Sequence, residues 1–247
     1  VELVEDSEVA KSCRRLLLGY YYQWEWEGDP DYEWMDARSA WASCVRKLIK
    51  TYGGEGFDTP ALVAKEARRR WNEGDTSSWV QKWHEWSLQK HKTPPKTVTH
   101  WITEEPLKYL IKKAHSMKSC IIWYDERAVA EKLDELGVRV VWPGKAVDKP
   151  HSGIVALSIS SHGTGLNLQS WCKQIFTVVR SSGSIWEQTL GRTHRLGQES
   201  DSVEAWVPSW GNAHRRSWSQ ALSDAEWIEM STGSRQKLSV CRVLREE

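Results

Sequence analysis

Apolar side chains recur at helical spacing through the first hundred residues of the chain. The clearest series is Trp34, Ala37, Trp41, Val45 and Leu48, whose members are three or four positions apart and share one face of a helix expected over residues 34–50. The same reasoning predicts helices over 8–18 and 61–71 and a further helix that begins at residue 77. An aromatic run over 20–26 predicts a short strand.

The pattern changes after the segment Thr93-Pro94-Pro95-Lys96, which is typical of a domain boundary. From there, short apolar runs alternate with amphipathic stretches, which predicts a mainly parallel sheet of five to seven strands over about 98–210, with helices on both faces. The expected strands are 120–123, 138–141, 154–159, 174–179 and 203–207, and the expected helices are 106–117, 126–136, 184–195 and 213–230. We therefore expect an α/β fold with a helical accessory region over 1–95 and an α/β domain over 96–247.

Composition narrows the class of protein further. The chain has 247 residues, and its 34 Lys and Arg against 33 Asp and Glu give a formal charge of +1, so we expect no general cationic coat. No apolar stretch is long enough for a membrane span, and the acidic opening lacks the apolar segment of a secretion signal. Five scattered cysteines predict neither disulfides nor a zinc site, and together these features favour a cytoplasmic protein. The 17 tryptophans are interpreted mainly as core residues, with base stacking as the alternative.

Two segments carry residue types that suit phosphate chemistry. Residues 158–169 form a loop after an apolar strand, and Gly163 and Gly165 let its backbone turn tightly. In the second segment, Gln188, Arg192 and Arg195 are four and three positions apart, so the expected helix over 184–195 would present them on one face. Two guanidinium groups and an amide on one face form a surface suited to a phosphate.

Together, in this order and about 25 residues apart, the two segments resemble the second RecA-like domain of superfamily 2 helicases and translocases. Within that group the chain resembles the branch of chromatin-remodelling ATPases and bacteriophage helicases. Residues 165–168 match its motif V and residues 188–198 match its motif VI, while the strand at 121–124 fits motif IV more loosely. The resemblance covers about residues 100–245 and implies a three-layer RecA-like domain, here preceded by a Trp-rich helical region. Residues 20–45 also resemble bacteriophage helicases.

The resemblance implies roles for individual residues at an ATP site. Arg195 is the first choice for an arginine finger and Arg192 the second, and Gln188 is expected to orient them. Gly165 and Asn167 match motif V positions near the nucleotide.

The resemblance also implies a nucleic-acid partner, with DNA preferred, although the residues themselves do not distinguish DNA from RNA. The expected contacts to its backbone come from Ser158, Ser160 and Thr164. The run Arg68-Arg69-Arg70 in the accessory region is interpreted first as a solvated face and second as a phosphate contact. Localisation in the cytoplasm of a bacterium or a phage-infected host follows from the same resemblance.

The sequence lacks the motifs with which the N-terminal lobe of such a helicase binds ATP and Mg²⁺. No G-x-x-x-x-G-K-[ST] loop occurs, and Asp125-Glu126 imitates a magnesium-binding motif without a phosphate loop before it. We therefore expect ATP and Mg²⁺ to be held mainly by an N-terminal helicase lobe that this sequence does not contain, and the isolated chain to be inactive as an ATPase. The alternative is a non-catalytic module that retains a helicase fold to bind nucleic acid or a partner.

Overall fold

The computed structural model describes residues 5–54, 57–147, 152–163 and 165–243. The chain forms two compact units, one made of residues 1–22 and 99–247 and the other of residues 23–98. The sequence places a boundary near Pro94 and Pro95, whereas the structure groups residues 5–22 with the sheet. The physical reason is burial, because Leu18 and Tyr20 belong to the same apolar cluster as the helices and strands after residue 105.

Helix α1 (Glu5–Leu18) opens the larger unit and ends at Gly19, whose φ of +94° favours glycine. Strand β1 (Tyr20–Glu25) follows, as the aromatic run predicts, and pairs with β2 (Lys96–Trp101) in a two-stranded sheet. An added Cβ at Gly19 would lie 2.1 Å from the carbonyl oxygen of Thr103. The backbone at Gly19 thus approaches Thr103 to a distance that only glycine allows.

The smaller unit is helical, as expected, and contains α2 (Tyr32–Tyr52), α3 (Pro60–Asn72) and α4 (Ser78–Gln89). The side chains of Asp31 and Thr59 cap α2 and α3 by accepting backbone N–H groups, and Pro60 occupies the first turn of α3. The apolar core of the smaller unit is formed around Trp41, Val45, Val63 and Ala67. The periodicity that predicted these helices is therefore the periodicity of their buried faces.

The main sheet is fully parallel and has the order β4-β3-β5-β6. Its strands are β3 (Cys120–Tyr124), β4 (Ile154–Ser158), β5 (Lys173–Phe176) and β6 (Glu204–Trp206). The expectation of five to seven strands is wrong for the described residues, which contribute four. The predicted strand over 138–141 makes only a single parallel bridge, between Val140 and Ala156, and β2 pairs with β1 instead.

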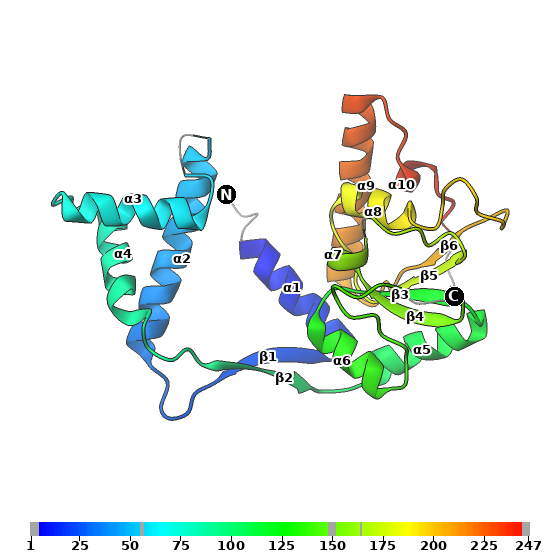
Figure 1. Ribbon diagram of the computed structural model, residues 1–247, viewed down its shortest axis with the longest axis horizontal. Helices are drawn as coiled ribbons and strands as arrows, with labels where there is room; N and C mark the ends of the chain where they lie inside the picture. Colours follow the sequence, from blue (N-terminus) through cyan, green and yellow to red (C-terminus); the bar gives the residue numbers. More distant parts are fainter. Residues whose placement is uncertain (1–4, 55–56, 148–151, 164, 244–247) are drawn as a thin grey trace. The chain divides into compact units, whose positions relative to one another are not determined.

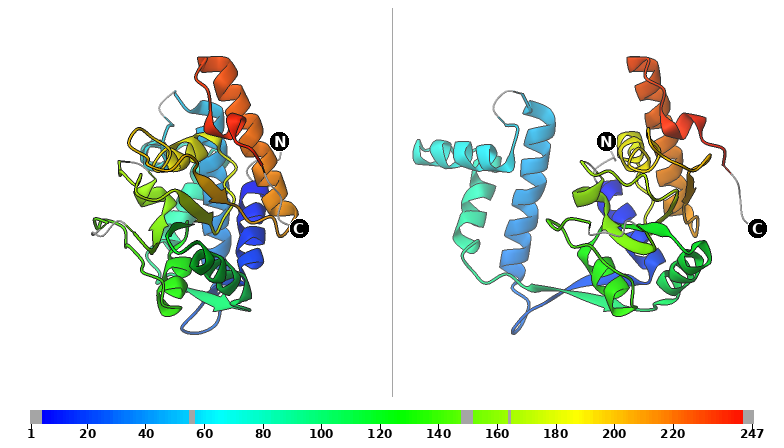
Figure 2. Two further views of the ribbon diagram at one scale, coloured as in Figure 1. Left: turned by 90° about the vertical axis from the view of Figure 1, so that its right-hand side faces the viewer. Right: turned by 45° about the vertical axis from the view of Figure 1, so that its right-hand side comes forward.

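Helices cover both faces of this sheet (Figures 1 and 2). On one face lie α5 (Glu105–Met117) and α6 (Arg127–Glu135), and on the other lie α8 (Gly183–Leu190), α9 (Asn212–Thr232) and α10 (Lys237–Val240). Strand β3 shows why, because all five of its residues are buried and they alternate between two cores. Ile121 and Trp123 join the α8–α9 side, while Cys120, Ile122 and Tyr124 join the α5–α6 side.

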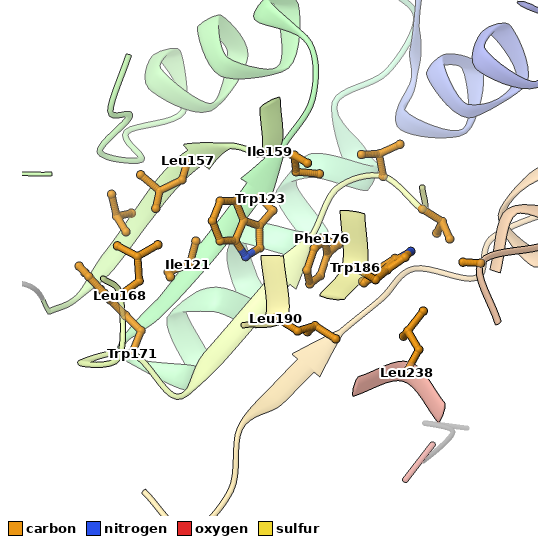
Figure 3. Packing of buried hydrophobic residues seen from close by; sticks show 14 of the residues in the cluster. Ile121, Trp123, Leu157, Ile159, Leu168, Trp171, Phe176, Trp186, Leu190 and Leu238 are labelled. Carbon is orange, nitrogen blue, oxygen red and sulfur yellow. The ribbon is translucent and has the colours of Figure 1, made fainter. Parts of the chain in front are cut away.

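Large aromatic rings fill the core between the sheet and α8 (Figure 3). Trp186 lies 4.5 Å from Phe176 between ring centroids, and both are almost fully buried, as are Trp123 and Trp171. The α/β class with a parallel sheet between helices is confirmed and is consistent with a RecA-like domain. No helix among the described residues is both long and apolar enough to cross a lipid bilayer.

Candidate functional site

The loop expected to contact nucleic acid begins inside the core. Ser158 ends β4 and is 2% exposed, and its Oγ caps the short helix α7 (Ile159–His162) by accepting the N–H of Ser161. Its backbone N–H donates to Nδ1 of His162, whose pKa is lowered by burial. Ser158 is therefore a structural residue of the loop, whereas Ser160 is exposed and shares a hydrogen bond of 2.9 Å with the Ser158 hydroxyl.

The remaining loop positions differ in what the structure shows. Gly165 has a φ of +78°, which a residue with a side chain would adopt only with strain, and Asn167 is exposed. Thr164 lies outside the described residues. The glycine-dependent turn that the sequence predicts is thus present at Gly165.

The helix expected over 184–195 ends earlier, at Leu190. The expectation that Gln188, Arg192 and Arg195 share one helical face is therefore wrong, because only Gln188 lies on α8. Tertiary hydrogen bonds hold Arg192 and Thr193 in a turn after the end of the helix. The carbonyl of Arg192 accepts the N–H of Leu168 at 3.1 Å, and the buried Thr193 hydroxyl accepts the Gln174 amide at 2.7 Å.

Arg192 connects the two predicted motifs directly. Its Nε donates to the carbonyl of Gly163 at 2.9 Å, and its Nη1 donates to the carbonyl of Leu166 at 3.2 Å. Burial lowers the pKa of Arg192, and the nearby Arg195 lowers it further. A half-buried guanidinium with two carbonyl acceptors positions the loop and has fewer donors left for a ligand.

The environment of Arg195 differs from that of the half-buried Arg192. Arg195 is exposed and makes no ion pair with any carboxylate of the residues that the structure describes. It lines an open cleft of about 400 Å³ together with His194, Leu196 and Gln198. Leu196 is 100% exposed, and the Gln198 amide anchors the turn by donating to the carbonyls of Trp171 and Thr193. Of the three residues predicted on the α8 side of the ATP site, Arg195 and Gln188 are exposed and Arg192 is half-buried.

A second cleft contains residues that the sequence reasoning missed. Lys11, Arg14 and Arg15 of α1 line it together with Asp125, Glu126 and Ser160. The adjacent pair Arg14-Arg15 was the available signal, but nothing in the sequence shows that α1 returns to the sheet edge. Ser160 is thereby separated from the Arg195 cleft, which has no lining residue in common with this one.

Two of the three arginines in the run Arg68-Arg69-Arg70 of the smaller unit form ion pairs with carboxylates. Arg69 pairs with Glu66 and Glu73, and Arg70 pairs with Glu66 while its guanidinium lies over the Trp79 ring. The two arginines lower the pKa of Glu66 to about 2. For Arg69 and Arg70 this geometry is that of a solvated ion-pair face, the first of the two interpretations of the run. Among the residues that can be placed, no group of three His, Cys, Asp or Glu is arranged to hold a metal ion.

Comparisons with known proteins add little to this geometry. No family model matches the chain, and no curated protein matches it. Among solved structures, the chain is similar to the crystal structure of the C-terminal part of the Fun30 ATPase domain, with 14% identity and a TM-score of 0.39. The match covers 65% of this chain and 64% of that chain, so it spans less than two thirds of the ATPase-domain chain.

Proposed function

We propose that this chain is the C-terminal lobe of an ATP-dependent nucleic-acid helicase or double-strand DNA translocase. In this proposal Arg195 is the arginine finger of an ATP site that an N-terminal lobe completes. The supporting observation is that Arg195 is exposed and without a carboxylate partner among the described residues, while Arg192 beside it connects the loop to the turn that carries Arg195. A guanidinium in that position presents unoccupied donors to a phosphate.

The motifs present in this sequence decide which ATP-site residues we assign to this chain and which to the N-terminal lobe. The phosphate loop and the Mg²⁺ ligands are assigned to the N-terminal lobe, since neither motif occurs here. When bound, Mg²⁺ neutralises charge on the nucleotide phosphates. This chain contributes Arg195, with Gln188 exposed on the helix just before it and Gly165 and Asn167 on the adjoining loop. The proposed setting is the cytoplasm of a bacterium or a phage-infected host.

The test is phosphate release from ATP. We expect the 247-residue chain alone to show no turnover above background, with or without DNA. A longer chain that includes the N-terminal lobe, or that lobe added separately, is expected to restore DNA-stimulated turnover, and Arg195→Ala is expected to abolish it. DNA binding without any turnover in the two-lobe protein would instead support the non-catalytic module.

A further inference from the structure

The cleft beside α1 lies at the edge of the sheet where α/β proteins bind ligands. It has a volume of about 380 Å³, and its walls include Asp125 and Glu126, which follow β3, and Ser160, which follows β4. The carboxyl ends of parallel strands are the usual ligand-binding edge of such a sheet. Helix α1 contacts α9 and α5 and covers this edge with Lys11, Arg14 and Arg15.

The two acidic residues of the cleft are already paired. Asp125 accepts a hydrogen bond from Arg180 at 2.5 Å, and Glu126 accepts two from Nε of Arg15, at 2.9 and 3.0 Å. Each pair is formally neutral. Arg14 is additional to these pairs, so three guanidinium groups face two carboxylates in and beside the cleft.

Arg14 is the guanidinium group of the cleft that forms no ion pair with a carboxylate of the described residues. Its Nη1 donates to the hydroxyl of Ser217 at 3.1 Å, and no ion pair joins it to a carboxylate within the described part of the chain. Burial lowers the pKa of Arg14 and the neighbouring Arg180 lowers it further, which together outweigh the opposite effect of Asp125 and Glu126. A partly buried guanidinium beside another cation, with most of its five N–H donors unused, would be stabilised by a bound anion.

We propose that this cleft binds a phosphate group of a nucleic-acid backbone, with the Arg14 guanidinium as the main ligand. Lys11 and the exposed Ser160 also line the cleft. Guanidinium groups suit phosphate because two parallel N–H donors match two phosphate oxygens. The inference rests on the proposed function only in taking nucleic acid as the source of the phosphate. The Arg195 cleft is separate, so a nucleotide bound there does not occupy this site.

The experiment measures binding of the 247-residue chain to fluorescein-labelled duplex and single-stranded DNA by anisotropy. Potassium chloride is varied between about 50 and 200 mM, because each phosphate contact contributes roughly 0.7 to 0.9 to the slope of log affinity against log salt. We expect Arg14→Gln to weaken binding several-fold and to reduce that slope by about one contact. The matched control is Arg127→Gln, since Arg127 is 84% exposed and pairs with Glu131 on α6, and it is expected to leave the slope unchanged.

A second variant separates phosphate binding from a structural role of Arg14. Ser217→Ala removes the hydrogen bond that Arg14 makes to α9 but retains the guanidinium. We expect Ser217→Ala to bind DNA as the unaltered chain does. If Ser217→Ala weakens binding as much as Arg14→Gln, Arg14 acts by holding α1 in place, and the proposal is overturned.

Competition identifies the source of the phosphate. We expect inorganic phosphate and ATP to displace DNA only weakly, and to the same extent in Arg14→Gln as in Arg127→Gln. Tight ATP binding that Arg14→Gln removes would assign the cleft to a free nucleotide and overturn the proposal. Failure of the unaltered chain to bind either DNA would also overturn it, whereas absent turnover in a two-lobe protein would refute only the proposed ATPase function.

Discussion

The Nε of Arg192 donates a hydrogen bond to the carbonyl of Gly163 at 2.9 Å. Those two residues belong to the two segments in which the sequence places the phosphate chemistry, and the bond joins the segments into one structure. Arg195, three residues further on, makes no comparable bond to the described residues of the loop. Two arginines that look equivalent in the sequence therefore have different physical roles.

Arg192→Gln is expected to destabilise the isolated chain by about 1–3 kcal/mol, because it removes charged hydrogen bonds to the carbonyls of Gly163 and Leu166. Urea unfolding followed by circular dichroism measures the loss. Arg195→Gln is the matched control and is expected to change stability by less than about 0.5 kcal/mol, since the side chain is exposed. Equal stability of the two variants would contradict the structural role of Arg192.

Arg195→Ala is expected to lower ATP turnover of the two-lobe protein by roughly 10³-fold or more, the range in which arginine fingers act. The unfolding midpoint of the variant should remain that of the unaltered protein, which shows that the effect is chemical. Steady-state phosphate release measures the turnover. A loss of less than tenfold would remove Arg195 from the role of finger.

His214 is expected to make the chain less stable in acid. It is 1% exposed, and burial together with the nearby Arg14 lowers its pKa to about 4, so the folded protein holds the ring neutral. The unfolded chain takes up a proton near pH 6.5, so this contribution is complete above that pH and is lost as the pH falls from about 6.5 to 4. By linkage the loss amounts to at most about 3 kcal/mol.

Thermal unfolding between pH 7 and 4 tests this pH dependence. His214→Phe retains a ring beside Trp210, whose centroid lies 6.0 Å away, and is expected to flatten the profile. The exposed His91 offers the control, since His91→Gln should leave the profile unaltered. A profile as steep in His214→Phe as in the unaltered chain would assign the acid sensitivity to other groups.

Gly183→Ala is expected to weaken the packing of α8 on α9 and to cost about 1–3 kcal/mol. An added Cβ would lie 2.7 Å from the backbone nitrogen of Ala225 and 3.1 Å from the carbonyl oxygen of Ala221, so a helix must move. Gly28→Ala is the control, because an added Cβ there meets nothing within 4 Å. Denaturant midpoints compare the two variants, and equal midpoints would show that α8 and α9 adjust without cost.

The double variant Arg69→Gln, Arg70→Gln is expected to leave the salt slope of DNA binding unchanged. Both arginines are held by Glu66, and Arg69 also by Glu73, so neither offers an unpaired charge to a phosphate. The anisotropy titration used for Arg14 provides the measurement. A slope reduced by one contact or more would show that the ion pairs open on binding and that the smaller unit contacts the nucleic-acid backbone.

Much of the local structure is predictable from the sequence because the signals are local. The helical spacing from Trp34 to Leu48 predicts α2, and the apolar run at residues 120–123 predicts β3, since each pattern describes a face that must be buried. The glycine at position 165 likewise marks the left-handed turn in its loop. These predictions need only the period of one element and the conformational range of one residue.

The sequence by itself determined the α/β class, the parallel sheet and the two segments, 158–169 and 188–198, that carry the candidate site residues. Only the tertiary structure decided that α8 ends at Leu190, because the groups that draw the chain out of the helix are Leu168 and Gln174, about 20 residues away. It also decided that α1 places Arg14 beside the sheet edge, where Asp125 and Glu126 are already neutralised. Helical periodicity records which face of an element is buried, but the partners that bury it and the charges that meet there come from distant parts of the chain.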